Sequence, residues 1–234
     1  MCTDTKSTPT ESSPPPLSIE ILADPRERKD ALKLIVDSVA QQRQTASRAI
    51  IFHPVSLSIL VPFLAFASYG SYVGNDYSSL LISCPGIIFA YLATIRYFTS
   101  AYIRTAEDTD WLNWLKNTDG AEDAILGARF GREIIAAVVL RLDKRDGRAL
   151  VRGWTTRSKY RQRGLGGDML GESVKIAKRT LGKDCTVEFA TDHANSTMPL
   201  YSIFNGPFLV RQLSAEKALA AAVKGWEEGK DDAQ

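Results

Sequence analysis

The spacing of apolar residues changes several times along the chain. Residues 17–23 form a short extended apolar run, and Asp24-Pro25 is a typical helix start. Apolar residues then recur with helical spacing as far as about Arg48, at Leu32, Ile35, Val36 and Val39. The pattern predicts a strand followed by a long helix over residues 17–48.

The next segment is almost free of charge. Asp76 is the only charged residue between positions 49 and 95. The two uncharged runs that it separates are each long enough for a bilayer core, which takes about 20 mainly apolar residues. Two buried core helices would give the same runs, but successive runs of this length are unusual in a small soluble domain. We therefore predict a two-helix transmembrane hairpin over residues 49–98, joined at Gly74-Asn75-Asp76.

The basic residues around this hairpin predict its orientation. They precede the first run and follow the second, and the connecting loop has none; they are Arg26, Arg28, Lys29, Lys33, Arg43, Arg48, Arg96 and Arg104. Positive charge favours the cytosolic side, so we expect an integral membrane protein with both termini in the cytosol. A monotopic hairpin, which enters the membrane without crossing it, would also leave both soluble parts on the cytosolic side. The modest span lengths favour the endoplasmic reticulum or another endomembrane.

From residue 124 the pattern is typical of strands. Extended runs over 124–130, 133–142 and 149–155 are separated by turn residues, which predicts an antiparallel meander. Helical spacing returns over 166–180, and 185–190 reads as one more strand. A right-handed crossover would place that strand parallel to the one before the helix. The fold class is therefore α+β, a mixed sheet with flanking helices.

The remaining segments are shorter or less regular. Residues 110–116 predict a short amphipathic helix, whose tryptophans either pack on the domain or rest at the membrane interface. Residues 208–213 read as a short strand and 215–228 as an Ala-rich helix. The Ser/Thr/Pro-rich residues 1–16 are predicted to be a disordered tail, and residues 229–234 a C-terminal tail.

Charge and composition exclude several functions. Lys+Arg number 29 and Asp+Glu 27, a formal net charge of +2, so no general polyanion-binding signature exists and nucleic acid is not an expected partner. The cysteines and histidines are too few and too far apart for a metal site or a disulfide framework; they are Cys2, Cys84, Cys185, His53 and His193.

The most informative segment for chemistry lies between the strand 149–155 and the helix 166–180. It reads Tyr160-Arg161-Gln162-Arg163-Gly164-Leu165-Gly166-Gly167. Glycines allow the backbone to approach a phosphate, and free N–H groups at a helix N-terminus attract an anion. The two arginines add positive charge at the same end. A tight strand-to-helix connection with solvated arginines would have a similar composition.

The stretch GWTTRSKYRQRGLGGDMLGESVKIAK resembles the acetyl-CoA motif of the GNAT superfamily, Arg/Gln-x-x-Gly-x-Gly/Ala, which Arg161, Gly164 and Gly166 fill. The resemblance covers residues 124–208. It implies a GNAT-like domain made of residues 17–48 and 105–228, interrupted by the hairpin, with acetyl-CoA as co-substrate. It also implies that the loop binds the pyrophosphate through Arg161, Gln162, Arg163, Gly164, Leu165, Gly166 and Gly167. The preceding strand would bind the pantetheine through Trp154, Thr155 and Thr156. Thr156 and Ser158 stand where Val and Pro are frequent.

The segment TDHANSTMPLYSIFNGPF resembles the next family element, a short helix with an Asn and a later Tyr. The resemblance makes Tyr201 a candidate acid for the CoA thiolate, and a half-buried anchoring aromatic is the other reading. Asn195 becomes a candidate cofactor ligand, although the spacing puts Ala194 at the usual Asn place and Pro199 would interrupt the helix.

Amine acetylation also needs a base, and no residue is compelling. His193, Glu188 and Asp192 are candidates, acting directly or through water. Glu188 is equally a solvated strand residue, and His193 a loop residue bonded to backbone. Cys185 fits a small core residue better than a nucleophile.

These features favour a membrane-anchored N-acetyltransferase that moves an acetyl group from acetyl-CoA to an amine, which is a small amine, an amino-acid conjugate or a lysine. The alternative is a catalytically inactive GNAT-like scaffold or chaperone for a membrane client protein at the endoplasmic reticulum. The missing base and the departures in the second segment motivate it. The expected partners are the bilayer and the amine acceptor, with a membrane protein client in the alternative.

Overall fold

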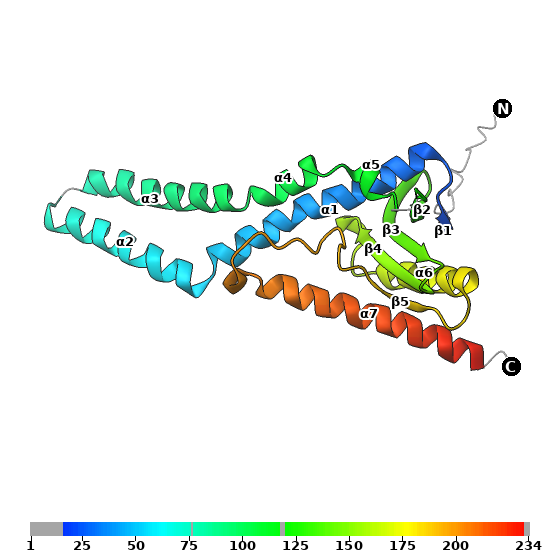
Figure 1. Ribbon diagram of the computed structural model, residues 1–234. Coiled ribbons are helices and arrows are strands. Elements are labelled where there is room, and N and C mark those ends of the chain that lie inside the picture. The colour runs from blue at the N-terminus through cyan, green and yellow to red at the C-terminus, as the bar shows by residue number, and fades with distance from the viewer. Residues whose placement is uncertain (1–15, 76, 118–119, 232–234) are drawn as a thin grey trace, which may run out of the picture.

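A computed structural model describes residues 16–75, 77–117 and 120–231 (Figure 1). Most of the two predicted tails, residues 1–15 and 232–234, and Asp76 in the predicted hairpin joint lie outside the described residues. In chain order the elements are β1 Leu17–Ile21, α1 Pro25–Ile51, α2 Pro54–Val73, α3 Tyr77–Phe98, α4 Ala101–Asp108, α5 Trp111–Trp114, β2 Ala124–Phe130, β3 Glu133–Asp143, β4 Arg148–Thr156, the 3-10 turn η1 Ser158–Tyr160, α6 Leu165–Leu181, β5 Thr186–Phe189, the 3-10 turn η2 Ser202–Phe204 and α7 Gly206–Asp231.

The strands form one five-stranded sheet in the order β1-β2-β3-β4-β5. The first four strands pair antiparallel, and β5 pairs parallel to β4 because α6 carries the chain back across the sheet. The predicted meander, crossover helix and mixed sheet are confirmed, with strand ends within about two residues of those expected.

Helices cover both faces of the sheet. One face packs on Ile35 and Val39 of α1 and on Leu115, which follows α5, against Ile125 and Val139 of the sheet. The other face packs on α6, and α7 lies outside α6, with Leu219 against Leu170 and Val174. Apolar side chains recur in α1 and α6 with the period of one helix face, which is why each helix buries one side on the sheet.

The sheet opens between β4 and β5. Val139 of β3 pairs with Gly153, whereas Leu140 pairs with Val151, so Arg152 is one extra residue in β4. Such a bulge bends the strand and re-aims it. The pairing of β4 with β5 stops at Val151 and Phe189, so β4 continues beyond its neighbour and leaves an open edge.

The helices α2 and α3 lie side by side and project from one end of the sheet domain (Figure 1). Each is part of a helix long and apolar enough to cross a membrane, and few of its residues are buried. Each also contains a proline, Pro62 or Pro85. Helices α1 and α4 pack on each other and connect the pair to the sheet domain. The structure therefore contains two candidate membrane spans where the hairpin was predicted.

Three details of the sequence prediction need correction. The predicted strand 208–213 is wrong, because α7 runs continuously from Gly206 to Asp231 and buries Phe208 and Leu219 along one side. The predicted C-terminal tail, residues 229–234, is likewise helical as far as Asp231. The helix predicted over 110–116 is shorter, Trp111–Trp114, and its tryptophans pack on the domain core.

Candidate functional site

The connection from β4 to α6 presents a row of free backbone donors. Gln162 and Gly164 have left-handed backbone angles, φ 62° and φ 83°. Helix hydrogen bonds begin only at Gly167, whose N–H donates to the carbonyl of Gly164 at 2.8 Å. Within the described residues, none of the backbone N–H groups of residues 162–166 donates a hydrogen bond. Successive free N–H groups at a helix N-terminus make a site for an anion such as a phosphate.

The glycines of this loop have different roles. A side chain at Gly164 or Gly167 would meet nothing within 4 Å, so these two leave the backbone open to a ligand. A Cβ at Gly166 would lie 3.0 Å from Cζ2 of Trp154, so Gly166 is small because the indole packs on it. Leu165 is buried in the core beneath α6. Of the predicted cofactor residues, Leu165 can therefore contribute only its backbone N–H.

Arg161 is fixed at the base of the loop. Its Nε donates to the carbonyl of Thr156 at 2.7 Å and its Nη2 to Oε1 of Gln41 in α1 at 2.9 Å. Partial burial and then the nearby guanidinium of Arg211 lower the pKa of Arg161. Among the described residues, neither arginine forms an ion pair with a carboxylate. Two neighbouring guanidinium groups without a carboxylate, with Arg163 exposed on the same loop, favour a bound anion.

The open edge of β4 follows from the alternation of its backbone groups. The N–H of Arg157 donates to Ile135 in β3 at 2.8 Å. Backbone groups alternate along a strand, so Thr155 also faces β3, and Trp154 and Thr156 face the open edge. The predicted pantetheine contacts are thus possible for the backbone of Trp154 and Thr156. Thr155 instead turns its backbone to β3, and its side chain is buried.

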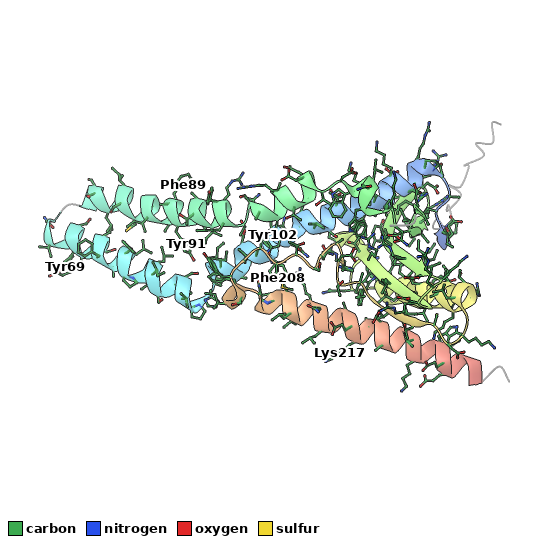
Figure 2. The ribbon with its side chains drawn as sticks, in the orientation of Figure 1. Tyr69, Phe89, Tyr91, Tyr102, Phe208 and Lys217 are labelled. Atoms are coloured by element: carbon green, nitrogen blue, oxygen red, sulfur yellow. The ribbon has the colours of Figure 1, made fainter. Side chains whose placement is uncertain are left out.

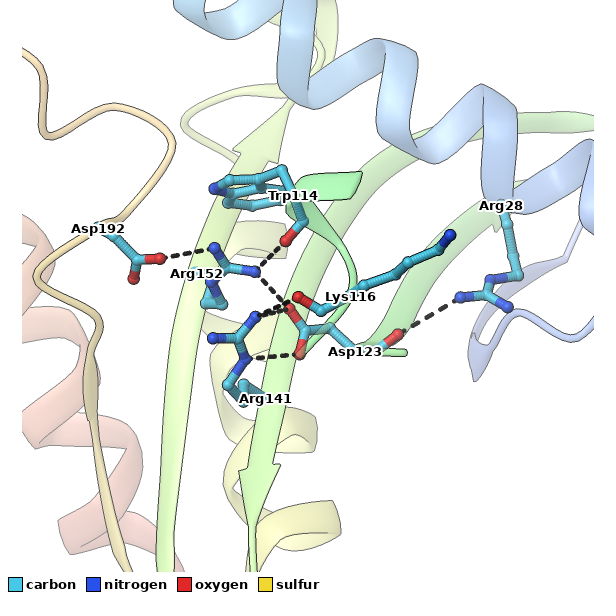
Figure 3. Close-up of polar contacts among 7 residues, drawn as sticks. All are labelled: Arg28, Trp114, Lys116, Asp123, Arg141, Arg152 and Asp192. Carbon is cyan, nitrogen blue, oxygen red and sulfur yellow. Dashed lines mark hydrogen bonds and ion pairs between the residues drawn. The ribbon is translucent and has the colours of Figure 1, made fainter. Parts of the chain in front are cut away.

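Arg152 holds the bulge in place through a buried network of charges (Figure 3). Its Nη1 donates to Asp123 at 2.6 Å and to the carbonyl of Trp114, and its Nη2 donates to Asp192 at 2.6 Å. Asp123 also accepts two hydrogen bonds from Arg141, at 2.8 and 3.1 Å. The guanidinium stacks on the ring of Trp114, 4.1 Å from its centroid. The sequence interpretation missed this network, whose one signal was a charged residue inside the apolar strand ALVRGWT.

The chain after β5 is tied to the same point. Ala190 donates to the carbonyl of Val151 at 3.0 Å, and Ala194 donates to the carbonyl of Arg152 at 2.7 Å. The residues between them therefore cross the place where β4 and β5 separate. The bulge, the open edge and the loop of free N–H groups thus lie in one continuous stretch, from Val151 to Gly167.

The model of the acetyltransferase (GNAT) family matches residues 89–204. This part of the chain is a GNAT acetyltransferase domain. The match includes the bulged strand, the loop of free N–H groups and β5, and it agrees with the resemblance noted in the sequence. No curated protein and no solved structure matches the chain. In the structure β1 and α1, which precede the matched residues, complete the sheet and one of the layers that cover it.

His193 of the GNAT domain does not offer a free basic nitrogen. Its Nδ1 accepts the backbone N–H of Asn195 at 3.1 Å, which leaves the proton of the neutral ring on Nε2. Nε2 is buried and has no hydrogen-bond partner among the described residues. Burial lowers the pKa of His193 to about 4, and the charge of Asp192 only partly opposes this. The ring packs edge-on against Phe189. This geometry does not support the predicted role of general base.

The two carboxylates considered as bases are both engaged. Glu188 is exposed, lies opposite Leu150 in the paired part of β5, and is 3.8 Å from Nη1 of Arg148. Burial alone would raise the pKa of Asp192, but its bond to Arg152 and the charge of that arginine lower it instead. A carboxylate with a lowered pKa is a weak base. Neither residue is therefore placed as a free base at the open edge.

Tyr201 lies away from the N–H loop, whereas Asn195 is held on α1 beside the residue that contacts Arg161. Asn195 bonds to α1, accepting from Nε2 of Gln42 at 3.0 Å through its carbonyl. Tyr201 is 76% exposed and precedes η2, where Phe204 contacts His53 with ring centroids 4.9 Å apart. Gln41, which contacts the loop through Arg161, lies ten residues before the end of α1, about 15 Å along the helix. The structure does not bring Tyr201 to the loop.

Proposed function

We propose that the chain is a membrane-anchored N-acetyltransferase that moves an acetyl group from acetyl-CoA to an amine. The GNAT domain indicates acyl transfer in general. The observation that carries the finer proposal is the row of free N–H groups at residues 162–166, which adjoins the open edge of β4. A diphosphate and an extended amide-containing chain are the two groups that such a surface would bind.

The residues present fit the co-substrate. The N–H groups of residues 162–166 would hold the pyrophosphate, with Arg163 and Arg211 supplying charge. The open edge at Trp154 and Thr156 would bond the amides of the pantetheine arm, as an added strand does. Acetyl-CoA supplies an activated thioester, whose C–S bond breaks as the amine nitrogen forms the amide. The protein would bind acetyl-CoA and the amine and orient them for the reaction.

Proton transfer in this proposal relies on water. His193 is neutral with its acceptor nitrogen occupied, and Asp192 is paired with Arg152. We therefore propose that the attacking amine loses its proton to solvent at the open edge, and that the thiolate takes one from solvent. An acceptor amine with a low pKa would suit such a site best, since more of it is neutral at pH 7.

The anchoring part of the proposal rests on α2 and α3. Their length, apolar composition and exposure support two membrane spans. Arginines at the domain end of the pair, Arg48 before α2 and Arg96 in the last turn of α3, favour a cytosolic position for the GNAT domain, where acetyl-CoA would be available. We propose the endoplasmic reticulum or another endomembrane, on span length.

A second candidate function is an inactive GNAT-like scaffold for a membrane client protein. The separation of Tyr201 from the N–H loop favours it, because the acid that the resemblance implies is not assembled there. This candidate predicts no release of CoA thiol in the presence of any amine, and co-purification of a membrane protein.

The experiment compares Gly167→Asp with Gly167→Ala in the full-length protein in detergent. Either side chain has open space at this position, and an acid in the first turn favours the helix, so both variants should fold. Calorimetry should show that Asp weakens acetyl-CoA binding about tenfold or more through charge repulsion, and that Ala does not. An amine panel with thiol detection then tests transfer.

The outcomes are distinct. If the wild-type protein does not bind acetyl-CoA, or if both variants bind it equally well, the loop is not the pyrophosphate site. Binding without thiol release from any amine would favour the scaffold. Arg211→Glu should also weaken binding, whereas Lys217→Glu, about 9 Å further along α7, should not.

A further inference from the structure

Exposed apolar side chains gather on one segment outside the two apolar helices. They come from the region around η2 and from the first two turns of α7, and they are Tyr201 at 76%, Ile203 at 56%, Leu209 at 50%, Val210 at 67% and Leu213 at 57% exposed. We call this set the η2–α7 face. Among the described residues beyond α4, the only other large exposed apolar side chain is Leu112.

The α7 part of this face points away from the domain. Phe208 packs inward, with its ring stacked on Tyr102 at 5.7 Å between centroids (Figure 2). At about 100° per residue, Leu209, Val210 and Leu213 lie within an arc of about 100° on the side of the helix opposite Phe208. No described part of the chain covers them. Further along the same side, Glu216 and Lys217 replace the apolar residues and are exposed. The helix thus changes from apolar to charged along one outer face.

The η2–α7 face is continuous with the base of the apolar helix pair. Phe204 of η2 contacts His53, the residue that precedes α2. In Figures 1 and 2, η2 and the start of α7 lie beside the junction of α1 and α2, and Lys217 lies further from that junction than Phe208. Phe52 and Tyr97, at the ends of the two apolar helices, are 72% and 70% exposed. Aromatic residues at this level are typical of a membrane–water interface.

We propose that the η2–α7 face docks on the bilayer surface, with its apolar side chains in the boundary between headgroups and acyl chains. An amphipathic surface of this kind inserts about 5–10 Å, which matches the first two turns of α7 and ends at Glu216 and Lys217. This proposal rests on the proposed membrane anchoring. The GNAT domain is then held against the membrane at two places, the helix pair and the η2–α7 face.

The test places single bimane labels on the full-length protein in phosphatidylcholine vesicles. Cys2 and Cys84 are replaced by serine, and Cys185 stays because it is only 6% exposed. Labels at Ile203→Cys and Val210→Cys probe the face. Phe66→Cys on α2 probes the anchor. Lys217→Cys, about 10 Å beyond Val210 along α7, and Ile21→Cys, an apolar site 52% exposed on β1, are the controls.

Quenching by lipids brominated on the acyl chains gives the answer. Labels at 203 and 210 should be quenched about twofold more strongly than labels at 217 and 21, since only a shallow layer of the chains is reached. Equal quenching at all four positions would overturn the docking, as would protection of 203 and 210 from aqueous iodide without lipid quenching, which indicates a protein partner. Quenching at 66 without 203 and 210 keeps the anchor and rejects the face. No quenching at 66 rejects the anchoring itself.

Discussion

The chain segments that follow β4 and β5 differ in almost every respect, although the two strands lie side by side. After β4, eight residues turn tightly through η1 and Gly164 into α6, and the backbone presents free N–H groups. After β5, twelve residues outside helices and strands lead to η2 and then to α7. Polar groups of these twelve residues bond to α1 and to β4. The first segment has the geometry of an anion site, and the second joins the sheet to α1 and α4.

This difference explains why the candidate phosphate-binding loop is easier to assign than the residues for acid–base chemistry. Phosphate binding by backbone N–H groups depends on local conformation, which a short glycine-containing loop fixes. Acid–base chemistry depends on side chains meeting across the fold. In this chain the segment after β5 is committed to other contacts, with Asp192 on Arg152 and Asn195 on Gln42.

The largest expected effect comes from Arg152→Leu, which breaks the link between the two segments. Arg152 is 3% exposed and bonds to Asp123 and Asp192 at once. Its removal leaves Asp123 buried with Arg141 as its remaining ion-pair partner and should cost about 3–5 kcal/mol of unfolding free energy. Chemical unfolding in detergent, followed by tryptophan fluorescence, measures the loss.

Arg148→Leu is the matched control for that experiment. Arg148 lies on the same strand, but its side chain is 50% exposed and pairs with the equally exposed Asp146. An exposed pair contributes about 0–1 kcal/mol. Similar losses for the two variants would show that the Arg152 network does not stabilise the bulge.

The next effect concerns pH and the loop after β5. The pKa of His193 is about 4 in the folded chain, below its usual value, so between pH about 6.5 and 4 the unfolded chain binds a proton that the folded chain does not. Stability should therefore fall as pH drops through this window, by about 3 kcal/mol in all. Thermal unfolding midpoints in detergent between pH 7 and 4 should show it.

His193→Asn separates this contribution from the carboxylates. The Oδ1 of the asparagine takes the place of Nδ1 and can still accept the N–H of Asn195, it does not titrate, and the carboxylates remain in both proteins. The difference between the two stability curves should therefore slope only in the window of His193. Parallel curves would show that His193 is not held neutral by burial.

The sequence allowed the sheet, α6 and the N–H loop to be predicted because their signals are local. Strand alternation, helical spacing and Gly164 after Arg161 each act within a few residues. The apolar runs of α2 and α3 are equally local. The crossover then fixed β5 parallel to β4.

The remaining features depend on contacts across the fold. Residues 208–213 have a strand-like pattern, yet they are helical because Phe208 packs on Tyr102, more than a hundred positions earlier. Arg152 and Asp123 meet only after three strands have paired. The position of Tyr201 depends on where Phe204 packs, on His53 between α1 and α2. A single sequence carries no local sign of these pairings.

The smallest expected effect is that of Tyr201→Phe, which tests whether the segment after β5 supplies a general acid. A general acid contributes about 100-fold or more to a rate, whereas an exposed tyrosine near η2 should change kcat/KM by about twofold or less. Acetyl transfer to the best amine of the panel is measured for the wild-type protein, Tyr201→Phe and, as the variant expected to be impaired, Gly167→Asp. If Tyr201→Phe loses activity about 100-fold and still binds acetyl-CoA normally, the segment after β5 must close on the loop after β4 during turnover, because only that movement brings the hydroxyl within reach of the thiolate.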